Sequence, residues 1–218
     1  MEIDRFEFEQ NLLRGGTVRI AGVDEAGRGP LAGPVVAAAV VLPMEWIQRG
    51  LPQGLRGLND SKQLTAAERE RFFERLISSP EVELGVGIVD VAIIDSINIL
   101  QATHRAMKQA LAELHPCAQH VLVDGLRVAA IELPQTALVR GDSRSFSIAG
   151  ASVIAKVSRD RLMAEYDQLY PMYAFAKNKG YGTAQHLAAL AEHGPCPIHR
   201  RSFAPIRQPE LELFQSQS

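Results

Sequence analysis

The chain has 218 residues, of which 46% are hydrophobic and 22% are charged, and its 23 basic and 25 acidic side chains give a formal net charge of −2. This composition is typical of a globular domain and excludes a collagen, a coiled coil and a largely disordered chain. No segment has the apolar core of a signal peptide or the roughly 20 apolar residues of a membrane helix. With only Cys117 and Cys196, far apart in the sequence, a reducing cytoplasm and no membrane contact are expected.

Strand and helix patterns alternate along the chain. Segments rich in small and β-branched apolar residues predict strands at residues 17–23, 34–42, 82–89 and 120–123. Apolar residues at helical spacing, with start and stop signals, predict helices at residues 65–78, 96–114, 147–170 and 183–193. This order predicts an α/β fold with a central mixed sheet flanked by helices. Residues 138–207 are richer in basic than in acidic residues, which would suit a local contact with a polyanion.

Two adjacent carboxylates, Asp24 and Glu25, end the first predicted strand and run into a glycine-rich turn. Successive strand residues face opposite sides of a sheet, so the pair could share a metal ion only if the backbone bends, which the glycines at 27 and 29 allow. A solvated turn in which Arg28 balances one acid explains the same residues equally well. Residues 21–30 alone leave both interpretations, a metal site and a solvated turn, open.

Two further acids occupy comparable places. Asp124 follows the apolar segment 120–123 and precedes Gly125, and Asp142 lies just before the helical pattern that starts at residue 147. Taken alone, Asp142 is most simply a helix cap. Carboxylates at strand ends and at a helix start can meet at one edge of a sheet, however, and hard oxygen ligands of this kind select Mg²⁺ or Mn²⁺.

Seven short motifs carry a resemblance to a known family. In chain order they are GVDEAGRG at 22–29, NDSK at 59–62, VDG at 123–125, GD at 141–142, AKVSRD at 155–160, KGY at 179–181 and HRRSF at 199–203. This order and spacing resemble the ribonuclease HII family, bacterial type 2 ribonucleases H, over roughly residues 17–207. The resemblance implies a ribonuclease H-like catalytic domain over 17–207 with a small helical C-terminal part, a leader at 1–16 and a tail at 208–218.

The resemblance also implies the site. Asp24, Glu25, Asp124 and Asp142 would be the catalytic residues and would bind two divalent ions, Mg²⁺ or Mn²⁺. Asp160 also lies in a family motif, but it falls well inside a predicted helix, where solvation or pairing with a neighbouring arginine is expected. It is therefore left out of the cluster.

The activity implied is that of an endoribonuclease that hydrolyses the RNA strand of RNA/DNA hybrids and cuts 5′ of ribonucleotides in duplex DNA, leaving 3′-hydroxyl and 5′-phosphate ends. The main chain at Gly27-Arg28-Gly29 would contact the ribonucleotide, and Tyr181 would pack on the following sugar. The substrate contacts expected are Gly27, Arg28, Gly29, Lys62, Arg144, Lys179 and Tyr181. The family's role suggests replication and repair.

The alternative is a catalytically inactive module that binds the same hybrids with the same fold. A monomer is expected, and a sliding-clamp contact is left open because no pattern supports it.

The chain departs from the family at Asn178, where many relatives have His, and at Gly150, where Ala is usual. His199 is equally well explained as a capping or a salt-bridge residue. The other histidines are expected at the surface or in packing.

Overall fold

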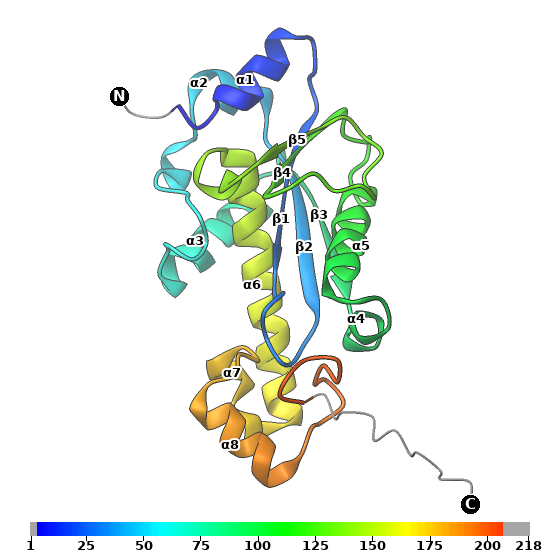
Figure 1. Ribbon diagram of the computed structural model, residues 1–218. Coiled ribbons are helices and arrows are strands. Elements are labelled where there is room, and N and C mark those ends of the chain that lie inside the picture. The colour runs from blue at the N-terminus through cyan, green and yellow to red at the C-terminus, as the bar shows by residue number, and fades with distance from the viewer. Residues whose placement is uncertain (1–3, 207–218) are drawn as a thin grey trace, which may run out of the picture.

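The structure is a computed structural model that describes residues 4–206, in which a five-stranded sheet has helices on both faces (Figure 1). The strands are β1 (Ile20–Ala26), β2 (Val35–Val41), β3 (Glu83–Val89), β4 (His120–Asp124) and β5 (Gln135–Leu138). Their order across the sheet is β3-β2-β1-β4-β5. β1, β2 and β3 pair antiparallel, whereas β1, β4 and β5 pair parallel, so the sheet is mixed.

The helices account for most of the remaining described chain. The α-helices are α1 (Glu7–Arg14), α2 (Met44–Arg49), α3 (Ala66–Ile77), α4 (Val91–Ile97), α5 (Ile99–Ala112), α6 (Phe146–Leu169), α7 (Phe175–Asn178) and α8 (Ala184–His193). Short 3-10 helices are η1 (Gln53–Leu55), η2 (Gly141–Ser143) and η3 (Pro171–Tyr173). In Figure 1, α6 and α3 lie on one side of the sheet, and α5 and α4 on the other. None of the helices within residues 4–206 is both long and apolar enough to cross a bilayer.

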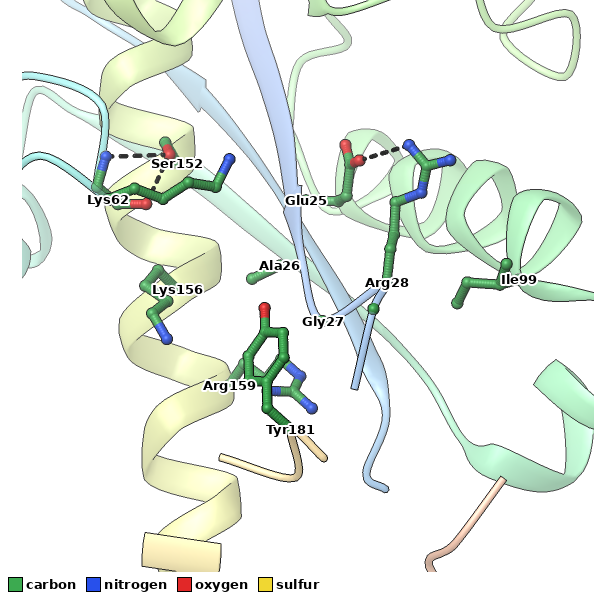
Figure 2. Close-up of a pocket in the computed structure, with 12 residues that line it drawn as sticks. Glu25, Ala26, Gly27, Arg28, Lys62, Ile99, Ser152, Lys156, Arg159 and Tyr181 are labelled. Carbon is green, nitrogen blue, oxygen red and sulfur yellow. Dashed lines mark hydrogen bonds and ion pairs between the residues drawn. The ribbon is translucent and has the colours of Figure 1, made fainter. Parts of the chain in front are cut away.

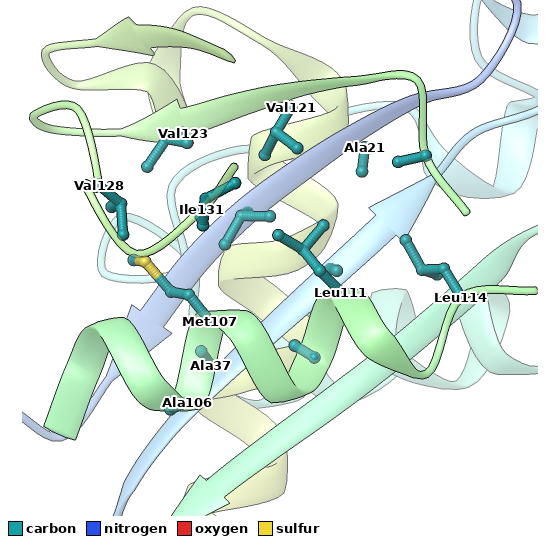
Figure 3. Close-up of a cluster of buried hydrophobic side chains, with 14 of the residues drawn as sticks. Ala21, Ala37, Ala106, Met107, Leu111, Leu114, Val121, Val123, Val128 and Ile131 are labelled. Atoms are coloured by element: carbon teal, nitrogen blue, oxygen red, sulfur yellow. The ribbon is translucent and has the colours of Figure 1, made fainter. Parts of the chain in front are cut away.

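The two faces of the sheet bury separate apolar clusters. On the α5 face, Ala21 and Val23 of β1 pack with α5 residues such as Met107 and Leu111 (Figure 3). The opposite face packs on α3 and α6. Because β2 is buried along its whole length, its sequence VVAAAVV is continuously apolar rather than alternating.

The 24-residue helix α6 lies very close to β1, and a glycine makes this approach possible. A Cβ atom at Gly22 would lie 2.1 Å from the Ser147 carbonyl carbon, so no larger residue fits there. Strand alternation puts Gly22 and Asp24 on the same face of β1. Asp24 therefore faces the start of α6.

All four predicted strands and the four predicted helical regions are present, with shifted boundaries. β1 extends to Ala26 and so includes both acids, whereas the prediction stopped at residue 23. The helix predicted at 96–114 is present as α5, but its predicted start is wrong, because helix α4 ends before Asn98, which has φ 70° and caps α5 with its side chain. The short strand β5 and the helices α1 and α2 were not predicted. The predicted tail at 208–218 lies outside the described residues.

The chain after α6 forms the small helical part that was expected. η3, α7 and α8 enclose a third apolar cluster that includes Tyr173 and Phe175. This C-terminal part contacts the turn after β1, because Ala32 forms an isolated β-bridge with His199 and the Leu31 amide donates to the Gly180 carbonyl at 2.8 Å.

Candidate active site

Three of the four predicted acids meet at one edge of the sheet. Asp24 and Asp124 lie at the carboxyl ends of the parallel neighbours β1 and β4, where Val23 pairs with Val123. Asp142 is contributed by η2, immediately before α6. Each offers a carboxylate oxygen, and these oxygens all lie within 4.8 Å of one another. Parallel pairing and one helix start thus gather three acids that are distant in the sequence.

Hydrogen bonds to the backbone fix two of these acids. The Gly141 amide donates to Asp124 Oδ1 at 2.6 Å, which ties η2 to the end of β4. From the N-terminal segment, Arg5 Nη2 donates to the Asp142 carbonyl oxygen at 2.7 Å. The leader predicted as a separate segment therefore contacts the acidic cluster directly.

The leader also binds the start of α6. Glu9 on α1 is fully buried, and its Oε1 accepts hydrogen bonds from Ser145 Oγ at 2.6 Å and from the Ser147 amide at 3.1 Å. A carboxylate at a helix N-terminus complements the helix dipole and satisfies amides that have no partner within the helix. α1 thereby holds the end of α6 that adjoins Asp142.

The electrostatics of the cluster reflect burial and repulsion between like charges. Burial and the negative charges of Glu25 and Asp124 raise the pKa of Asp24 well above its usual range. Burial and the charges of Asp124 and Asp60 raise the pKa of Asp142 to about 6. Such shifts mean that the protein does not itself neutralise Asp24 and Asp142, so a bound cation would stabilise their ionised forms.

Glu25 lies outside this three-acid group. β1 continues its regular pairing with β2 through Ala26, so the backbone does not make the bend that would turn Glu25 to the same side as Asp24. Its side chain instead lies beside Arg28, with Arg28 Nη1 donating to Glu25 Oε1 at 3.1 Å (Figure 2). Burial raises the pKa of Glu25, and Arg28 opposes that increase.

An open cleft of about 580 Å³ adjoins the acids. Of the predicted substrate contacts, Gly27, Arg28, Gly29, Lys62 and Tyr181 line it, together with Glu25 (Figure 2). The Tyr181 side chain is available to a ligand, since the residue is 48% exposed. Burial lowers the pKa of Lys62, but the surrounding carboxylates, Asp24 foremost, raise it more, so the ammonium stays charged.

Two predicted cations lie outside this cleft. Lys179 lines a neighbouring groove with Asp160, and its Nζ donates to the Asp160 carbonyl oxygen at 3.5 Å. Arg144 lies over the ring of Phe8, 5.1 Å from the ring centroid. Asp160 lies in α6, as predicted, but the partner expected for it is wrong, because its carboxylate pairs with Lys156 at 2.7 Å rather than with a neighbouring arginine.

Several residues of the cleft were missed from the sequence. Ser152, Lys156 and Arg159 line it from α6, and Ser61 lines it from the loop before α3. Ser152 Oγ lies 2.9 Å from Ser61 Oγ, and a hydrogen bond from the Ser152 hydroxyl partly opposes the rise in the pKa of Asp24. The sequence spacing could have identified the three α6 residues, because positions 152, 156 and 159 are four and three apart and so share one face of a helix.

Asn178 and His199, whose roles the sequence did not decide, have structural roles. Asn178 shapes the turn before Tyr181, because its Oδ1 accepts from the Gly180 amide at 2.8 Å. His199 is buried and forms no salt bridge within the described chain. Its Nδ1 accepts from the Cys196 amide at 2.9 Å, and its Nε2 lies 2.9 Å from His186 Nε2. Capping of the 196–199 turn, rather than ion pairing, is therefore its role.

Comparison with known proteins agrees with this geometry. The family model for ribonuclease HII matches residues 21–206. Ribonuclease HII of Geobacter metallireducens is 54% identical over 203 residues, which cover 92% of this chain and 91% of that protein. Ribonuclease HII of Chloroflexus aurantiacus is 56% identical over 210 residues, which cover 95% and 97% respectively.

The fold is similar to that of solved ribonucleases H. The crystal structure of ribonuclease H2 from Pyrococcus horikoshii aligns with a TM-score of 0.70 at 30% identity, covering 87% of this chain and 95% of that one. The predicted α/β ribonuclease H-like fold is thereby confirmed. The match over most of the chain and the identities above 50% lead to one conclusion: the chain belongs to the ribonuclease HII family.

Proposed function

We propose that Asp24, Asp124 and Asp142 hold divalent metal ions with which this endoribonuclease hydrolyses the RNA strand of RNA/DNA hybrids, and that Glu25, which lines the adjoining cleft, is a ligand of a second ion rather than a partner of Asp24 at the same one. The observation that carries the proposal is the convergence of three carboxylate oxygens within 4.8 Å, next to Glu25, which lines an open cleft. Mg²⁺ or Mn²⁺ suits the donor set, because both are hard cations that prefer carboxylate oxygens.

The fit of a cation can be judged from the acids themselves. Burial first, and repulsion between carboxylates this close second, raise the pKa of Asp24 and of Asp142. Within residues 4–206, no lysine or arginine forms an ion pair with any of the three acids. Divalent ions would therefore supply the positive charge that the cluster lacks.

The chemistry that bound ions supply is activation of the attacking water and stabilisation of the leaving oxygen. The carboxylates would hold these ions, and the protein would need no nucleophile of its own. Lys62 lies at the cleft beside the acids, where its charge would attract a phosphate of the cleaved strand. Hydrolysis by this route leaves a 3′-hydroxyl and a 5′-phosphate.

Selection of the cleavage position would fall to the glycine-rich turn and Tyr181. The 2′-hydroxyl distinguishes RNA from DNA, and main-chain groups can reach it only where side chains do not intervene. Gly27 and Gly29 provide such access at the cleft, and a Cβ at Gly29 would lie 3.6 Å from the Tyr181 ring. Tyr181 would pack on the sugar that follows the ribonucleotide, so cleavage is expected 5′ of a ribonucleotide in duplex DNA.

A non-catalytic module that only binds hybrids is not favoured. Three clustered carboxylates beside a polyanion would weaken binding unless cations neutralise them. The acids therefore serve a hydrolase better than a binding module.

The test uses a labelled DNA duplex that carries one ribonucleotide, with an all-DNA duplex of the same sequence as control. With Mg²⁺ or Mn²⁺, incision 5′ of the ribonucleotide and intact control DNA are expected, and EDTA should abolish cleavage. Incision at another position would refute the proposed recognition. Absence of cleavage with either ion, on this duplex and on a long hybrid, would favour the binding module.

A further inference from the structure

Two buried arginines lie beneath the glycine-rich turn. Arg159 is 1% exposed and Arg200 is fully buried, and neither forms an ion pair within the described chain. Burial lowers the pKa of Arg159 to about 10, and burial together with the charge of Arg159 lowers that of Arg200 to about 9. Both values lie above neutrality, so two unpaired positive charges are buried here. Such an arrangement is costly unless other groups solvate the charges.

Carbonyl oxygens of the turn solvate Arg200. Its Nη2 donates to the Gly27 carbonyl at 2.5 Å, its Nη1 to the Arg28 carbonyl at 2.9 Å and its Nε to the Gly33 carbonyl at 3.0 Å. One planar guanidinium thus holds both ends of the turn that leads from β1 to β2. Backbone hydrogen bonds from Leu31 and Gly33 to the C-terminal part hold the middle of the turn, and Arg200 holds the Gly27–Arg28 end to them.

Arg159 joins the same turn to the segment that carries Tyr181. Its Nε donates to the Pro34 carbonyl at 3.0 Å and its Nη2 to the Ala32 carbonyl at 3.0 Å, while its Nη1 donates to the Lys179 carbonyl at 2.9 Å. Arg159 and Tyr181 line the same cleft (Figure 2). Arg159 therefore bridges two segments that are far apart in the sequence.

The backbone carbonyls of the glycine-rich turn accept hydrogen bonds from the two arginines, but two backbone amides of the same turn have no acceptor in the described part of the chain. Within residues 4–206, the backbone N–H groups of Arg28 and Gly29 donate no hydrogen bond, and both residues line the cleft. A turn whose carbonyls are held by buried arginines has its amides left to donate to a ligand. Gly27 is required for this packing, because a Cβ there, at φ 95°, would lie 2.0 Å from Arg159 Nε.

We propose that Arg159 and Arg200 are positioning residues that fix the Gly27–Gly29 turn relative to Tyr181 and thereby determine the selectivity for a single ribonucleotide in DNA. The inference rests on the proposed function, in which the turn and Tyr181 read the ribonucleotide and the following sugar. A shift between the two would misplace the turn amides from the 2′-hydroxyl. A long hybrid offers a 2′-hydroxyl at every position of the RNA strand, so it depends less on that alignment.

Lysine is the informative substitute at both positions. Lysine keeps the positive charge but replaces the rigid five-donor fork by a single point charge with three donors. Arg159→Lys and Arg200→Lys therefore preserve the field in the cleft while loosening the turn. Arg161→Lys is the matched control, because Arg161 lies on the same helix but pairs with Glu70 and Glu74 at the surface.

The experiment compares kcat/KM on a duplex with one ribonucleotide against kcat/KM on a long RNA/DNA hybrid. For Arg159→Lys and Arg200→Lys, the ratio of the two values should fall about tenfold or more, mostly through kcat on the single-ribonucleotide duplex. Mn²⁺ affinity, measured by calorimetry, should stay at the wild-type value because the acids are untouched. The ratio should not change for Arg161→Lys.

Several outcomes would overturn the inference. An unchanged ratio in folded variants would contradict it, as would equal losses on both substrates, which mark a purely structural role. Two positions are tested so that the result does not depend on one variant folding, and thermal melting identifies the folded ones. Failure of the proposed function is distinct, because the wild-type protein would then cleave neither substrate or show no preference for the ribonucleotide position.

Discussion

The cleft joins two regions that bury like charges in opposite ways. At the acidic end, Asp24, Asp124 and Asp142 converge within 4.8 Å, and burial and mutual repulsion raise the pKa of Asp24 and Asp142. At the basic end, Arg159 and Arg200 are also buried, but backbone carbonyls accept hydrogen bonds from their guanidinium groups. The basic end is therefore complete within the chain, whereas the acidic end needs a cation from outside.

This difference separates contacts that are a permanent part of the fold from contacts to an exchangeable metal ion. A guanidinium solvated by carbonyls is bound as part of the fold, because its partners are the chain itself. Carboxylates with few internal donors keep lone pairs for an ion that arrives with the substrate or before it. Metal ions and pH should accordingly change the stability of the acidic end and not that of the basic end.

The largest effect is expected from removal of one acid. Asp124→Asn keeps the size of the side chain and should keep the fold, yet it should lower kcat on a hybrid by roughly a thousandfold, about 4 kcal/mol of activation free energy. Asp160→Asn is the control, because that carboxylate pairs with Lys156 rather than with the cluster. Activity at the wild-type level in Asp124→Asn, measured with Mg²⁺ and with Mn²⁺, would refute the assignment.

At the basic end, Arg200→Met should destabilise the protein. It leaves the buried carbonyls of Gly27 and Gly33 without donors, so the free energy of unfolding should fall by about 3 kcal/mol. Urea denaturation should give the same loss in EDTA and in Mn²⁺. A loss that disappears when Mn²⁺ is added would contradict the independence of the two ends.

The pH dependence of the acidic end has a defined sign. Because the folded state raises the pKa of Asp142 from an ordinary value near 4 to about 6, the folded state binds more protons than the unfolded state between these values. The metal-free protein should therefore lose stability as pH rises through this window. Above this window, Asp142 is ionised in a buried place beside Asp124 and Asp60, and the metal-free protein bears the full cost of that charge.

Asp142→Asn removes this buried charge. The difference in unfolding free energy between variant and wild type should change sign when metal is added. In EDTA at about pH 8, the variant should be more stable than the wild type by about 1 kcal/mol, a value that allows for solvent screening. Below about pH 4 the two should be equally stable. With saturating Mn²⁺ at about pH 8 the wild type should be the more stable protein. Equal stability in EDTA across the whole pH range would show that the cluster is not under repulsion.

The two ends also differ in how far the sequence predicts them. Asp24 and Asp124 could be placed because each follows an apolar strand, and parallel strands end at one edge of a sheet. The buried role of Arg159 and Arg200 could not be predicted, because arginine is ordinarily a surface or phosphate-binding residue and carbonyl acceptors leave no trace in a sequence. Only the tertiary contact between the C-terminal part and the turn after β1 creates that role.

The N-terminal helix illustrates a second limit. The sequence predicts only a leader segment at residues 1–16 and no helix there. Its contribution depends on Arg5 and Glu9 meeting the start of α6, more than 130 residues later in the chain. Local patterns such as the Thr65–Glu68 capping box are visible in sequence, whereas the same capping supplied by a distant residue is not.

The smallest expected effect is a change in stability at Gly150, a position that involves neither the acidic cluster nor the buried arginines. Gly150 lies in the interior of α6, and a Cβ there would approach Val40 Cγ1 at 3.4 Å, an ordinary contact. Gly150→Ala should therefore raise the free energy of unfolding by about 0.5–1 kcal/mol, since alanine restricts the unfolded chain more than glycine does. Ala151→Gly, its neighbour on the same helix, should lower the stability. Both shifts should be independent of metal and pH, because neither residue is charged. A gain for Gly150→Ala that depends on Mn²⁺ would mean that packing of α6 on β2 is coupled to the acidic cluster, and the two ends would then not be independent.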